Sequence, residues 1–294
     1  MPSRRSSNPQ PPTKFAHLDP LHVIRKAREA GITEVAVSFS GGRDSLAVLD
    51  LCKKHFATVY AYWMYVVPGL EFQEKYLRYI ERRYSLDILR IPHWMLANMF
   101  RRGVLRHPTN ASMSLRRTRI RHVDAYVRKQ FGCDGLYIAS GEKYSDSLER
   151  NTQIVQCGGL STVRHRLYPI GFWTHYDVQS YVARQNIVMP PDYRLRPQVS
   201  SRRRGQFGSL LTFDEIIPIR DNFPDDYQRI CKYFPQLPAQ MARYESQDFR
   251  QMIQDRESAA EAARANAHVI RSQKRAERLA NRNKRGADGE DQTS

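Results

Sequence analysis

Residues 35–45, with the sequence VAVSFSGGRDS, constrain the fold of this chain more than any other stretch. Five mostly apolar, β-favouring residues run into Ser-Gly-Gly. A helical spacing of apolar residues follows directly, at Leu46, Val48, Leu49 and Leu51. This order predicts a buried strand, a tight turn and the start of a helix.

The turn between this strand and this helix has the chemistry of a phosphate cradle. Gly41 and Gly42 let the backbone take φ > 0 and approach a ligand without a Cβ in the way. The amides at the helix start, with the helix dipole behind them, favour an anion. Ser40 and Ser45 add hydroxyl donors, and Arg43 adds a positive charge. The alternative interpretation is an ordinary strand–helix junction with a Gly-Gly turn.

The spacing of this loop separates it from two common phosphate-binding motifs. It has neither the G-x-x-x-x-G-K-S/T order of the usual P-loop nor the order G-x-G-x-x-G. It resembles the S-G-G-x-D-S signature of the PP-loop ATP pyrophosphatases, nucleotide α-hydrolases whose loop grips the pyrophosphate of ATP. The resemblance implies an adenine nucleotide site at residues 40–45.

Helical and strand patterns alternate along the chain up to residue 139. The predicted elements are helices at 20–30, 45–55, 71–84, 94–101 and 115–130 and strands at 35–39, 58–67, 87–91 and 136–139. This alternation favours a doubly wound α/β fold, with a mostly parallel sheet covered on both faces. Ligands of such sheets bind at the carboxyl ends of the strands. We therefore expect the loop at 40–42 and the Ser140-Gly141 turn at one rim.

Two further motifs follow in order. Residues 141–150, GEKYSDSLER, match the G-x-R-x-x-E-S-x-x-R element of phosphoadenosine phosphosulfate (PAPS) reductases, with Lys143 and Asp146 in place of the usual Arg and Glu. Residues 168–181 are similar to the family pattern P-I-x-x-W-x-x-x-D-V-x-x-Y. Within them, Thr174 and Asp177 form a capping-box variant that starts a helix, with Trp173 packed against it.

Three motifs in the correct order, across residues 35–193, identify the chain as a member of the PAPS reductase superfamily of PP-loop proteins. The resemblance implies a Rossmann-like sheet of the adenine nucleotide α-hydrolase kind, with a helical C-terminal extension. It also implies ATP, or a related adenine nucleotide such as PAPS, together with Mg²⁺.

The four cysteines argue against reduction as the activity. Cys52, Cys133, Cys157 and Cys231 form no C-x-x-C pair, so we expect no structural metal ion and no iron–sulfur cluster. PAPS reductases carry a catalytic cysteine in an E-C-G-L-H segment near the C-terminus, which this chain lacks. Cys231 lies in RICKY, a context that favours a buried structural cysteine over an activated thiolate.

Charge and hydropathy indicate which kinds of partner to expect for this chain. The chain of 294 residues has 47 Lys and Arg against 30 Asp and Glu, a net charge of +17 that favours polyanionic partners. The N-terminus lacks an apolar signal core, and no run approaches the ~18 apolar residues of a membrane span. These features predict a cytoplasmic protein without a membrane partner.

Two acid-free basic clusters are candidates for contact with phosphate. Residues 101–121 hold seven arginines and no acid. Arg116, Arg117 and Arg119 cannot all face one side of a helix, so at least one should reach solvent or phosphate. The second cluster contains Arg202, Arg203 and Arg204. Both clusters are predicted to bind substrate or nucleic acid, and a solvated surface is the open alternative.

The composition predicts five parts in the chain. They are a flexible leader at 1–18, a nucleotide-binding domain at 19–193, a basic loop at 194–209, a helical region at 210–285 and a disordered tail at 286–294. The helical region includes two short helices, at 212–217 and 225–234, and one long helix from Ala239 onward.

The resemblance assigns roles to particular residues. The expected nucleotide-binding residues are Ser38, Ser40, Gly41, Gly42, Arg43, Asp44, Ser45, Gly141 and Ser147. The expected catalytic residues are Arg43, Asp44, Lys143 and Arg150. Asp44 would either cap the helix or assist Mg²⁺, and capping is the favoured interpretation.

The function implied is that of a transferase or sulfurtransferase that cleaves ATP at the α-phosphate and activates an acceptor oxygen by adenylation. DNA or RNA modification and sulfur transfer are the favoured settings, with a homo-oligomer or a sulfur-supplying protein as partner. Two alternatives stay open. One is a nucleotide- or nucleic-acid-binding protein without turnover, and the other is a phosphoadenylyl-sulfate reductase with an unrecognised thiol.

Overall fold

The computed structural model describes Asp19, residues 21–191 and 213–246, and the isolated positions 251, 255, 258 and 259. The chain divides into two compact units, 1–235 and 236–294, and the sheet belongs to the first. The predicted leader, the basic loop with Arg202, Arg203 and Arg204, and the predicted tail lie outside the described residues.

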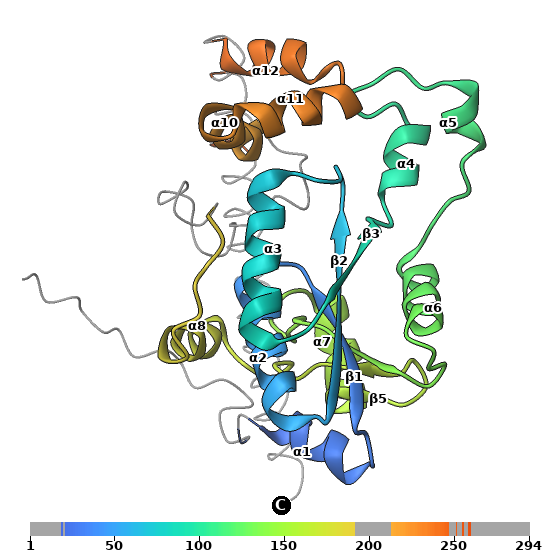
Figure 1. Ribbon diagram of the computed structural model, residues 1–294, viewed down its shortest axis with the longest axis vertical. Helices are drawn as coiled ribbons and strands as arrows, with labels where there is room; N and C mark the ends of the chain where they lie inside the picture. Colours follow the sequence, from blue (N-terminus) through green and yellow to red (C-terminus); the bar gives the residue numbers. More distant parts are fainter. Residues whose placement is uncertain are drawn as a thin grey trace, which may run out of the picture. The chain divides into compact units, whose positions relative to one another are not determined.

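The described part of the first unit is built on a six-stranded sheet in the order β3-β2-β1-β4-β6-β5 (Figure 1). The strands are β1 (Glu34–Phe39), β2 (Thr58–Tyr65), β3 (Ile88–Pro92), β4 (Tyr137–Ala139), β5 (Leu160–Ser161) and β6 (Arg166–Leu167). Pairing is parallel from β3 to β6, and only β5 runs antiparallel to its neighbour. The mostly parallel α/β sheet predicted from the sequence is confirmed.

The hairpin of β5 and β6 extends the sheet beyond β4 and was not predicted. Each of its strands is two residues long, too short to display the alternation of apolar and polar residues that marks a strand. β6 pairs with β4 through Ile138 and Ala139, opposite Arg166 and Leu167. Leu167 is fully buried, so the hairpin adds to the core.

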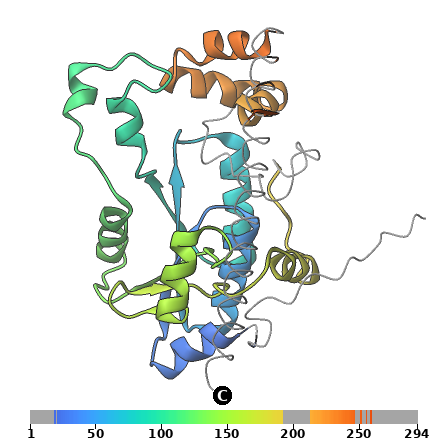
Figure 2. The ribbon, with the colours of Figure 1, turned by 180° about the vertical axis from the view of Figure 1, so that it is seen from behind.

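Helices lie on both sides of the sheet (Figures 1 and 2). They are α1 (His22–Glu29), α2 (Arg43–His55), α3 (Glu71–Tyr84), α4 (Leu96–Arg101), α5 (Asn110–Ser114), α6 (Ile120–Gln130), α7 (Leu148–Cys157), α8 (His175–Arg184), α10 (Phe213–Asn222) and α11 (Pro224–Tyr233). In the second unit the structure describes α12 (Leu237–Glu245). Figure 1 shows α2 and α3 in front of the strands, and Figure 2 shows α7 on the opposite side.

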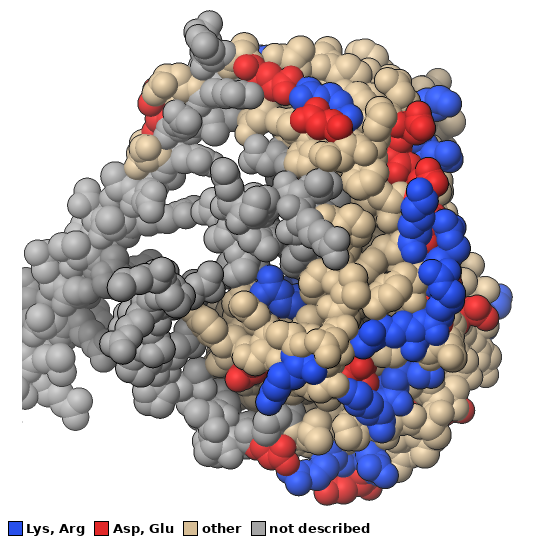
Figure 3. Space-filling view, turned by 60° about the vertical axis from the view of Figure 1, so that its left-hand side comes forward, with Lys and Arg blue, Asp and Glu red and all other residues tan. Residues whose placement is uncertain are grey.

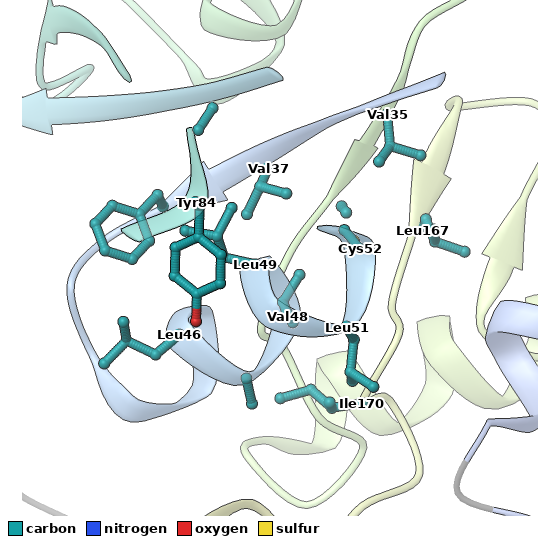
Figure 4. Packing of buried hydrophobic residues seen from close by; sticks show 14 of the residues in the cluster. Val35, Val37, Leu46, Val48, Leu49, Leu51, Cys52, Tyr84, Leu167 and Ile170 are labelled. Atoms are coloured by element: carbon teal, nitrogen blue, oxygen red, sulfur yellow. The ribbon is translucent and has the colours of Figure 1, made fainter. Parts of the chain in front are cut away.

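The larger core lies between the sheet and helices α1, α2, α3 and α8. Val35, Val37 and Phe39 of β1 point to this side, because alternate residues of a strand share a face. Figure 4 shows Val35 and Val37 directed at α2, whose Val48 and Leu49 are fully buried. A central parallel strand of this kind is buried on both faces, which explains its nearly continuous apolar sequence.

The smaller core lies between the opposite face of the sheet and α6. It contains Ala36, Ile138 and Tyr62 from the strands and Val123 and Val127 from the helix. The two helix residues are four positions apart, so they lie on one side of α6. Together the two cores hold β1 rigidly in the middle of the sheet, where its carboxyl end presents the loop at 40–42.

Three sequence-based predictions about helices were wrong. The predicted helix at 115–130 starts only at Ile120, because Thr118 is held outside it by a hydrogen bond from its hydroxyl to the carbonyl of Trp94. The long helix predicted from Ala239 onward is interrupted, since α12 ends at Glu245 and Ser246 has extended backbone angles. Helix α7 begins at Leu148, inside the second motif, and was missed.

Helix α3 receives its N-terminal cap from a distant part of the chain. The carboxylate of Asp226, in the first turn of α11, accepts hydrogen bonds from the amides of Glu71 (2.7 Å) and Phe72 (3.0 Å). Asp226 is buried, and its charge complements the positive end of the α3 dipole. Phe72 also stacks on Phe223, which precedes α11. These contacts join the α10–α11 pair to the sheet-bearing domain.

Candidate functional site

The loops after β1 and β4 meet at the point where the strand order reverses. The chain leaves β1 toward β2 and β3 on one side, and β4 lies on the other side. In doubly wound sheets a ligand binds at such a switch point, outside the carboxyl ends of the strands. Residues 40–42 and 140–147 therefore border the position where this fold binds its ligands.

The loop after β1 is closed by its own serine. The Ser45 hydroxyl accepts a hydrogen bond from the Ser40 amide (3.2 Å) and donates one to the Gly42 carbonyl (2.9 Å). Ser45 is buried, and its hydroxyl hydrogen is used inside the loop. The observed contacts make Ser45 a residue that shapes the loop, and its role as a phosphate donor stays a prediction.

The two glycines of the loop have different conformations. Gly41 has φ +76°, and a Cβ built on it would lie 2.9 Å from a ring carbon of Trp63 on β2. Gly42 has φ −72° and is the N-cap of α2, with no side-chain cap. Positive φ is thus required at Gly41 alone, and Gly42 leaves the first turn of α2 without a capping side chain.

The second loop touches the first through a glycine. A Cβ on Gly141 would lie 3.0 Å from the carbonyl carbon of Asp44 and 3.1 Å from the amide nitrogen of Ser45. Only a residue without a side chain allows this approach of two backbones. Gly141 therefore brings the loop after β4 against the start of α2.

A buried ion pair joins the same two segments. The Lys143 ammonium lies 2.6 Å from Asp44 Oδ2 and 3.2 Å from Asp146 Oδ1, and Lys143 is only 4% exposed. The Asp146 carboxylate also accepts a hydrogen bond from the Lys143 amide (2.9 Å). The favoured role of Asp44 as a helix cap was wrong. Its carboxylate pairs with Lys143, while Gly42 occupies the N-cap.

The remaining residues of the second motif surround this pair. Arg150 lies 3.3 Å from Glu142 and 3.7 Å from Asp146, and it is partly exposed. The Ser147 hydroxyl accepts a hydrogen bond from the Arg150 amide and so caps α7. The structure thus brings together Asp44, Lys143 and Arg150 as one cluster of alternating charges, and it gives Ser147 a structural contact.

The third motif adds a residue that sequence reasoning missed. The capping box of Thr174 and Asp177 is confirmed, and α8 starts at His175. The imidazole Nε2 of His175 lies 3.3 Å from a guanidinium nitrogen of Arg43, at the start of α2. The sequence could have indicated this residue, because His175 directly follows the predicted N-cap Thr174, at the rim where the other helices also begin.

A buried carboxylate on α2, that of Asp50, attaches this helix to its neighbours. Buried Asp50 accepts hydrogen bonds from the hydroxyls of Tyr84 (3.1 Å) and Tyr181 (2.6 Å), and it pairs with Lys54 (2.6 Å). Burial, followed by the hydrogen bond to Asp50, raises the pKa of Tyr181, so this phenol stays protonated as a donor. Tyr181 also packs edge-on against Trp173, as the third motif predicted. The network joins α2 to α3 and α8.

Ser38 and the three arginines of the first basic cluster lie outside this constellation. Ser38 is part of β1 and pairs in register with Tyr62, whose pKa burial raises to about 12. Arg116, Arg117 and Arg119 are exposed between α5 and α6. Because residues 116–119 lie outside a helix, no helix face has to divide these arginines.

A buried arginine supports the smaller core near the rim. The guanidinium of Arg166 on β6 forms a bidentate pair with Asp124 of α6, at 2.7 Å and 2.6 Å. Burial would lower the pKa of Arg166, but the Asp124 carboxylate outweighs it and holds that pKa above the ordinary value. The pair links α6 to the sheet and is structural.

Two of the four cysteines have a thiol whose ionisation is disfavoured. Burial raises the pKa of both Cys52 and Cys231, which is the opposite of what an activated nucleophile requires. In the described ranges, no group of three or more His, Cys, Asp or Glu side chains could hold a metal ion. No helix in the described part of the chain is long and apolar enough to cross a bilayer.

Comparison with known sequences agrees with the three motifs. The profile of the phosphoadenosine phosphosulfate reductase domain matches residues 34–196, which is more than half of the chain. The chain belongs to the PAPS reductase family. This family assignment covers the sheet, the loop at 40–45 and both later motifs.

Among relatives of this PAPS reductase family member is sulfate adenylyltransferase subunit 2 of Streptomyces lavendulae. It is 26% identical over 226 residues, which are 67% of this chain and 69% of the relative. A phosphoadenylyl-sulfate reductase of Candida auris, in complex with phosphate, has a TM-score of 0.41 and 13% identity over 62% of this chain and 87% of its own. A U34-tRNA thiolase of Methanococcus maripaludis, which carries a 4Fe–4S cluster, has a TM-score of 0.41 and 16% identity over 74% and 78%.

Proposed function

We propose that this chain binds ATP between the loops after β1 and β4 and cleaves it between the α- and β-phosphates. The observation that carries the proposal is the pair of side-chain-free contacts at Gly41 and Gly141, which shape a backbone cradle at the switch point of the sheet. In the reaction an acceptor hydroxyl oxygen forms a bond to the α-phosphorus. The bond from that phosphorus to pyrophosphate breaks, and the hydroxyl proton goes to solvent.

The residues of the cradle would act mainly by binding and orienting. The first turn of α2 offers amides to the pyrophosphate, and Arg43 supplies charge beside them. Lys143 sits in the wall of the site, fixed by two carboxylates. A transfer of this type depends on positioning and on stabilising charge as it develops, so preorganised donors can provide much of the rate enhancement.

The residues present fit pyrophosphate better than they fit a metal ion. The three carboxylates of the site, on Asp44, Asp146 and Glu142, each pair with Lys143 or Arg150. Mg²⁺ is commonly held by one or two carboxylates together with substrate phosphates. Asp44, which is partly exposed, is the protein ligand we would assign to Mg²⁺, and the phosphates would provide the rest. Mg²⁺ would supply neutralisation of the phosphate charge.

The same pairing favours a second candidate, a nucleotide-binding protein without turnover. Carboxylates that are already paired bind a metal ion less readily, so the site could hold ATP without cleaving it. The third interpretation, a reductase, loses support from the raised thiol pKa values of Cys52 and Cys231. A Cys231→Ser variant should accordingly keep the nucleotide chemistry.

Two measurements test the proposal. Isothermal titration calorimetry with ATP and with pyrophosphate should show that both bind and compete. Chromatography of the products should show pyrophosphate and an AMP-modified acceptor, and not ADP and phosphate, when tRNA or DNA is supplied as acceptor. Absence of ATP binding, or formation of ADP, would refute the proposal. ATP binding without products from any acceptor would support the second candidate.

A matched pair of variants makes the binding result specific. Arg43→Ala should weaken ATP binding about tenfold or more, because it removes a charged donor at the cradle. Arg78→Ala, at an exposed position on α3, removes the same charge elsewhere and should leave the affinity unchanged. Equal losses in the two variants would mean that ATP responds to net charge alone.

A further inference from the structure

An unusual stretch of sequence lies between β3 and α6. Residues 88–123 contain eight arginines and no aspartate or glutamate. The stretch includes α4 and α5 and the two connections that flank α5. The question is which of these arginines the fold itself uses.

Three of the eight have structural partners. Arg90 pairs with Glu74 and Glu81 of α3. Arg101 donates to the carbonyls of Met113 and Leu115 and so holds the end of α5, and Arg106 donates to the carbonyl of Tyr233 and lies over the ring of Phe100. These three side chains therefore stabilise the fold.

Of the other five, Arg102 is exposed after α4, and the remaining four are exposed and close together in sequence. Arg116, Arg117, Arg119 and Arg121 have no acidic partner in the described part of the chain. We call this segment, residues 115–121, the arginine strip. Residues 116–119 belong to no helix or strand, Arg119 has extended backbone angles as the N-cap of α6, and Arg121 lies in the first turn of that helix.

Hydrogen bonds to neighbouring segments fix the backbone of the strip. The Thr118 hydroxyl donates to the carbonyl of Trp94, and the Asn98 amide donates to the carbonyl of Thr118 (3.5 Å). The capping box of Thr109 and Ser112 fixes the start of α5, just before the strip. The four like charges thus lie on a backbone that is tethered at Thr118 and continues into the first turn of α6, which lowers the entropy lost when they bind an anionic chain.

Exposed apolar side chains lie among and beside these arginines in the sequence. Met113 and Tyr126 are each 48% exposed, and Leu115 and Ile120 are 39% and 38% exposed. Tyr126 lies on the side of α6 that also carries His122, four residues earlier. Arginines interleaved with flat or apolar side chains suit a chain of alternating phosphates and bases.

The strip lies on the side of the domain that carries the strand ends. Thr118 of the strip donates to the carbonyl of Trp94, which lies two residues after the carboxyl end of β3. The strip is therefore attached at the edge where the parallel strands end, and the loops of the proposed nucleotide site lie at the same edge. A polymer bound along the strip would extend toward that rim.

We propose that the arginine strip binds a single-stranded nucleic acid, with its phosphates on the arginines and its bases against Tyr126 and the neighbouring apolar side chains. An acidic protein surface would match the charge but would leave the exposed ring without a stacking partner. The further step, that this strand supplies the acceptor oxygen, rests on the proposed function.

The test is a salt titration of fluorescence anisotropy, without ATP, on labelled single strands of RNA and DNA with the same mixed sequence. Binding at ~50 mM salt should weaken steeply toward ~200 mM. Replacing Arg116, Arg117 and Arg119 by Ala should reduce the slope of log K against log[salt] by roughly two units, at ~0.7 per lost phosphate contact on a single strand. Tighter binding of RNA or of DNA would identify the natural class.

A control of equal charge uses exposed arginines outside the strip; Figure 3 shows that Lys and Arg also gather among acids on one face of the molecule. Arg28, Arg78 and Arg82 are exposed on α1 and α3, and their replacement by Ala should leave the slope unchanged. A Tyr126→Leu variant should lose about fivefold in affinity if a base stacks on it. Single strands should also bind more tightly than a duplex of the same sequence.

Three results would overturn the proposal. They are no binding at ~50 mM salt, equal losses in the two triple variants, or tighter binding of the duplex with no effect of Tyr126→Leu. The first would redirect the strip to an acidic protein partner. Calorimetry with ATP separates this outcome from failure of the nucleotide site, because the strip variant should keep its ATP affinity whether or not it binds nucleic acid.

Discussion

Replacement of Gly41 by alanine is the sharpest perturbation of the cradle. Gly41 has φ +76°, a conformation that costs an L-residue about 1–2 kcal/mol. The new Cβ would also lie 2.9 Å from Cζ3 of Trp63, whereas carbon atoms at rest are about 3.5–4.0 Å apart. Overpacking of this kind costs about 1–3 kcal/mol. We therefore expect Gly41→Ala to lower the free energy of unfolding by about 2–5 kcal/mol.

Gly42 provides the matched control. It has φ −72°, which alanine adopts without strain, and it occupies the N-cap of α2. Gly42→Ala should cost only about 0.5–1 kcal/mol, the difference between the two residues at an N-cap. A motif that treats the glycines as equivalent predicts equal costs, so the contrast between the two variants tests the geometry of the loop.

The assay is urea denaturation followed by circular dichroism, combined with calorimetry for ATP. A double-mutant cycle with Trp63→Val separates the two contributions at Gly41, because removing the ring should relieve the steric part and leave the backbone part. If Gly41→Ala costs less than 1 kcal/mol, or costs the same with and without the ring, then our description of the loop is wrong.

Two further predictions concern the scaffold. Asp226→Ala should lower the free energy of unfolding by about 2 kcal/mol, because it leaves the amides of Glu71 and Phe72 without their cap. Asp225→Ala, in the same first turn of α11, should lower it by under ~0.5 kcal/mol. Chemical denaturation measures both losses, and equal losses would contradict the capping role of Asp226. Burial lowers the pKa of His93 below 6.5, so its contribution to stability is complete above pH 6.5 and is lost as the pH falls toward the folded-state pKa. The midpoint of thermal unfolding should therefore fall on acidification, and less so in His93→Asn, whose side-chain oxygen can replace Nδ1 as acceptor for the Met95 amide; identical pH profiles would exclude His93 as the source.

The strand–loop–helix unit at 34–55 could be predicted because its signals are local. An apolar run, two glycines and a helical spacing follow one another within about twenty residues, and each independently favours the same structure. The capping box at Thr174 is local in the same way and was also confirmed. Where every determinant of an element lies inside the element, the sequence alone is sufficient.

The contacts that assemble the site depend on residues far apart in the chain. Gly141 needs to be a glycine because Asp44 and Ser45 pack against it, and no pattern within 141–150 reveals that neighbour. Thr118 stops a helix because Trp94 offers it a carbonyl. Asp226 caps a helix that begins 155 residues earlier, at Glu71. The role of each of these residues can be recognised only when the topology is known.

The charges of the site also show where its preference for an anion originates. Arg43, Lys143 and Arg150 supply three positive side chains, and the carboxylates paired with the last two are three in number, on Asp44, Asp146 and Glu142. These formal charges cancel. What does not cancel is the backbone, since α2 and α8 both begin here, with Arg43 and His175 in contact at their first residues.

Each helix start carries about half a positive charge, in amides that point outward along the axis. A site built in this way holds a compact pyrophosphate by directed hydrogen bonds at short range. The arginine strip differs in kind, because its four cations lie on side chains in solvent, where attraction is long-range and screened by salt. The two anion-binding surfaces that we propose for this domain would thus differ in their physics. A small nucleotide suits the first, and a polymer that must be captured from solution suits the second.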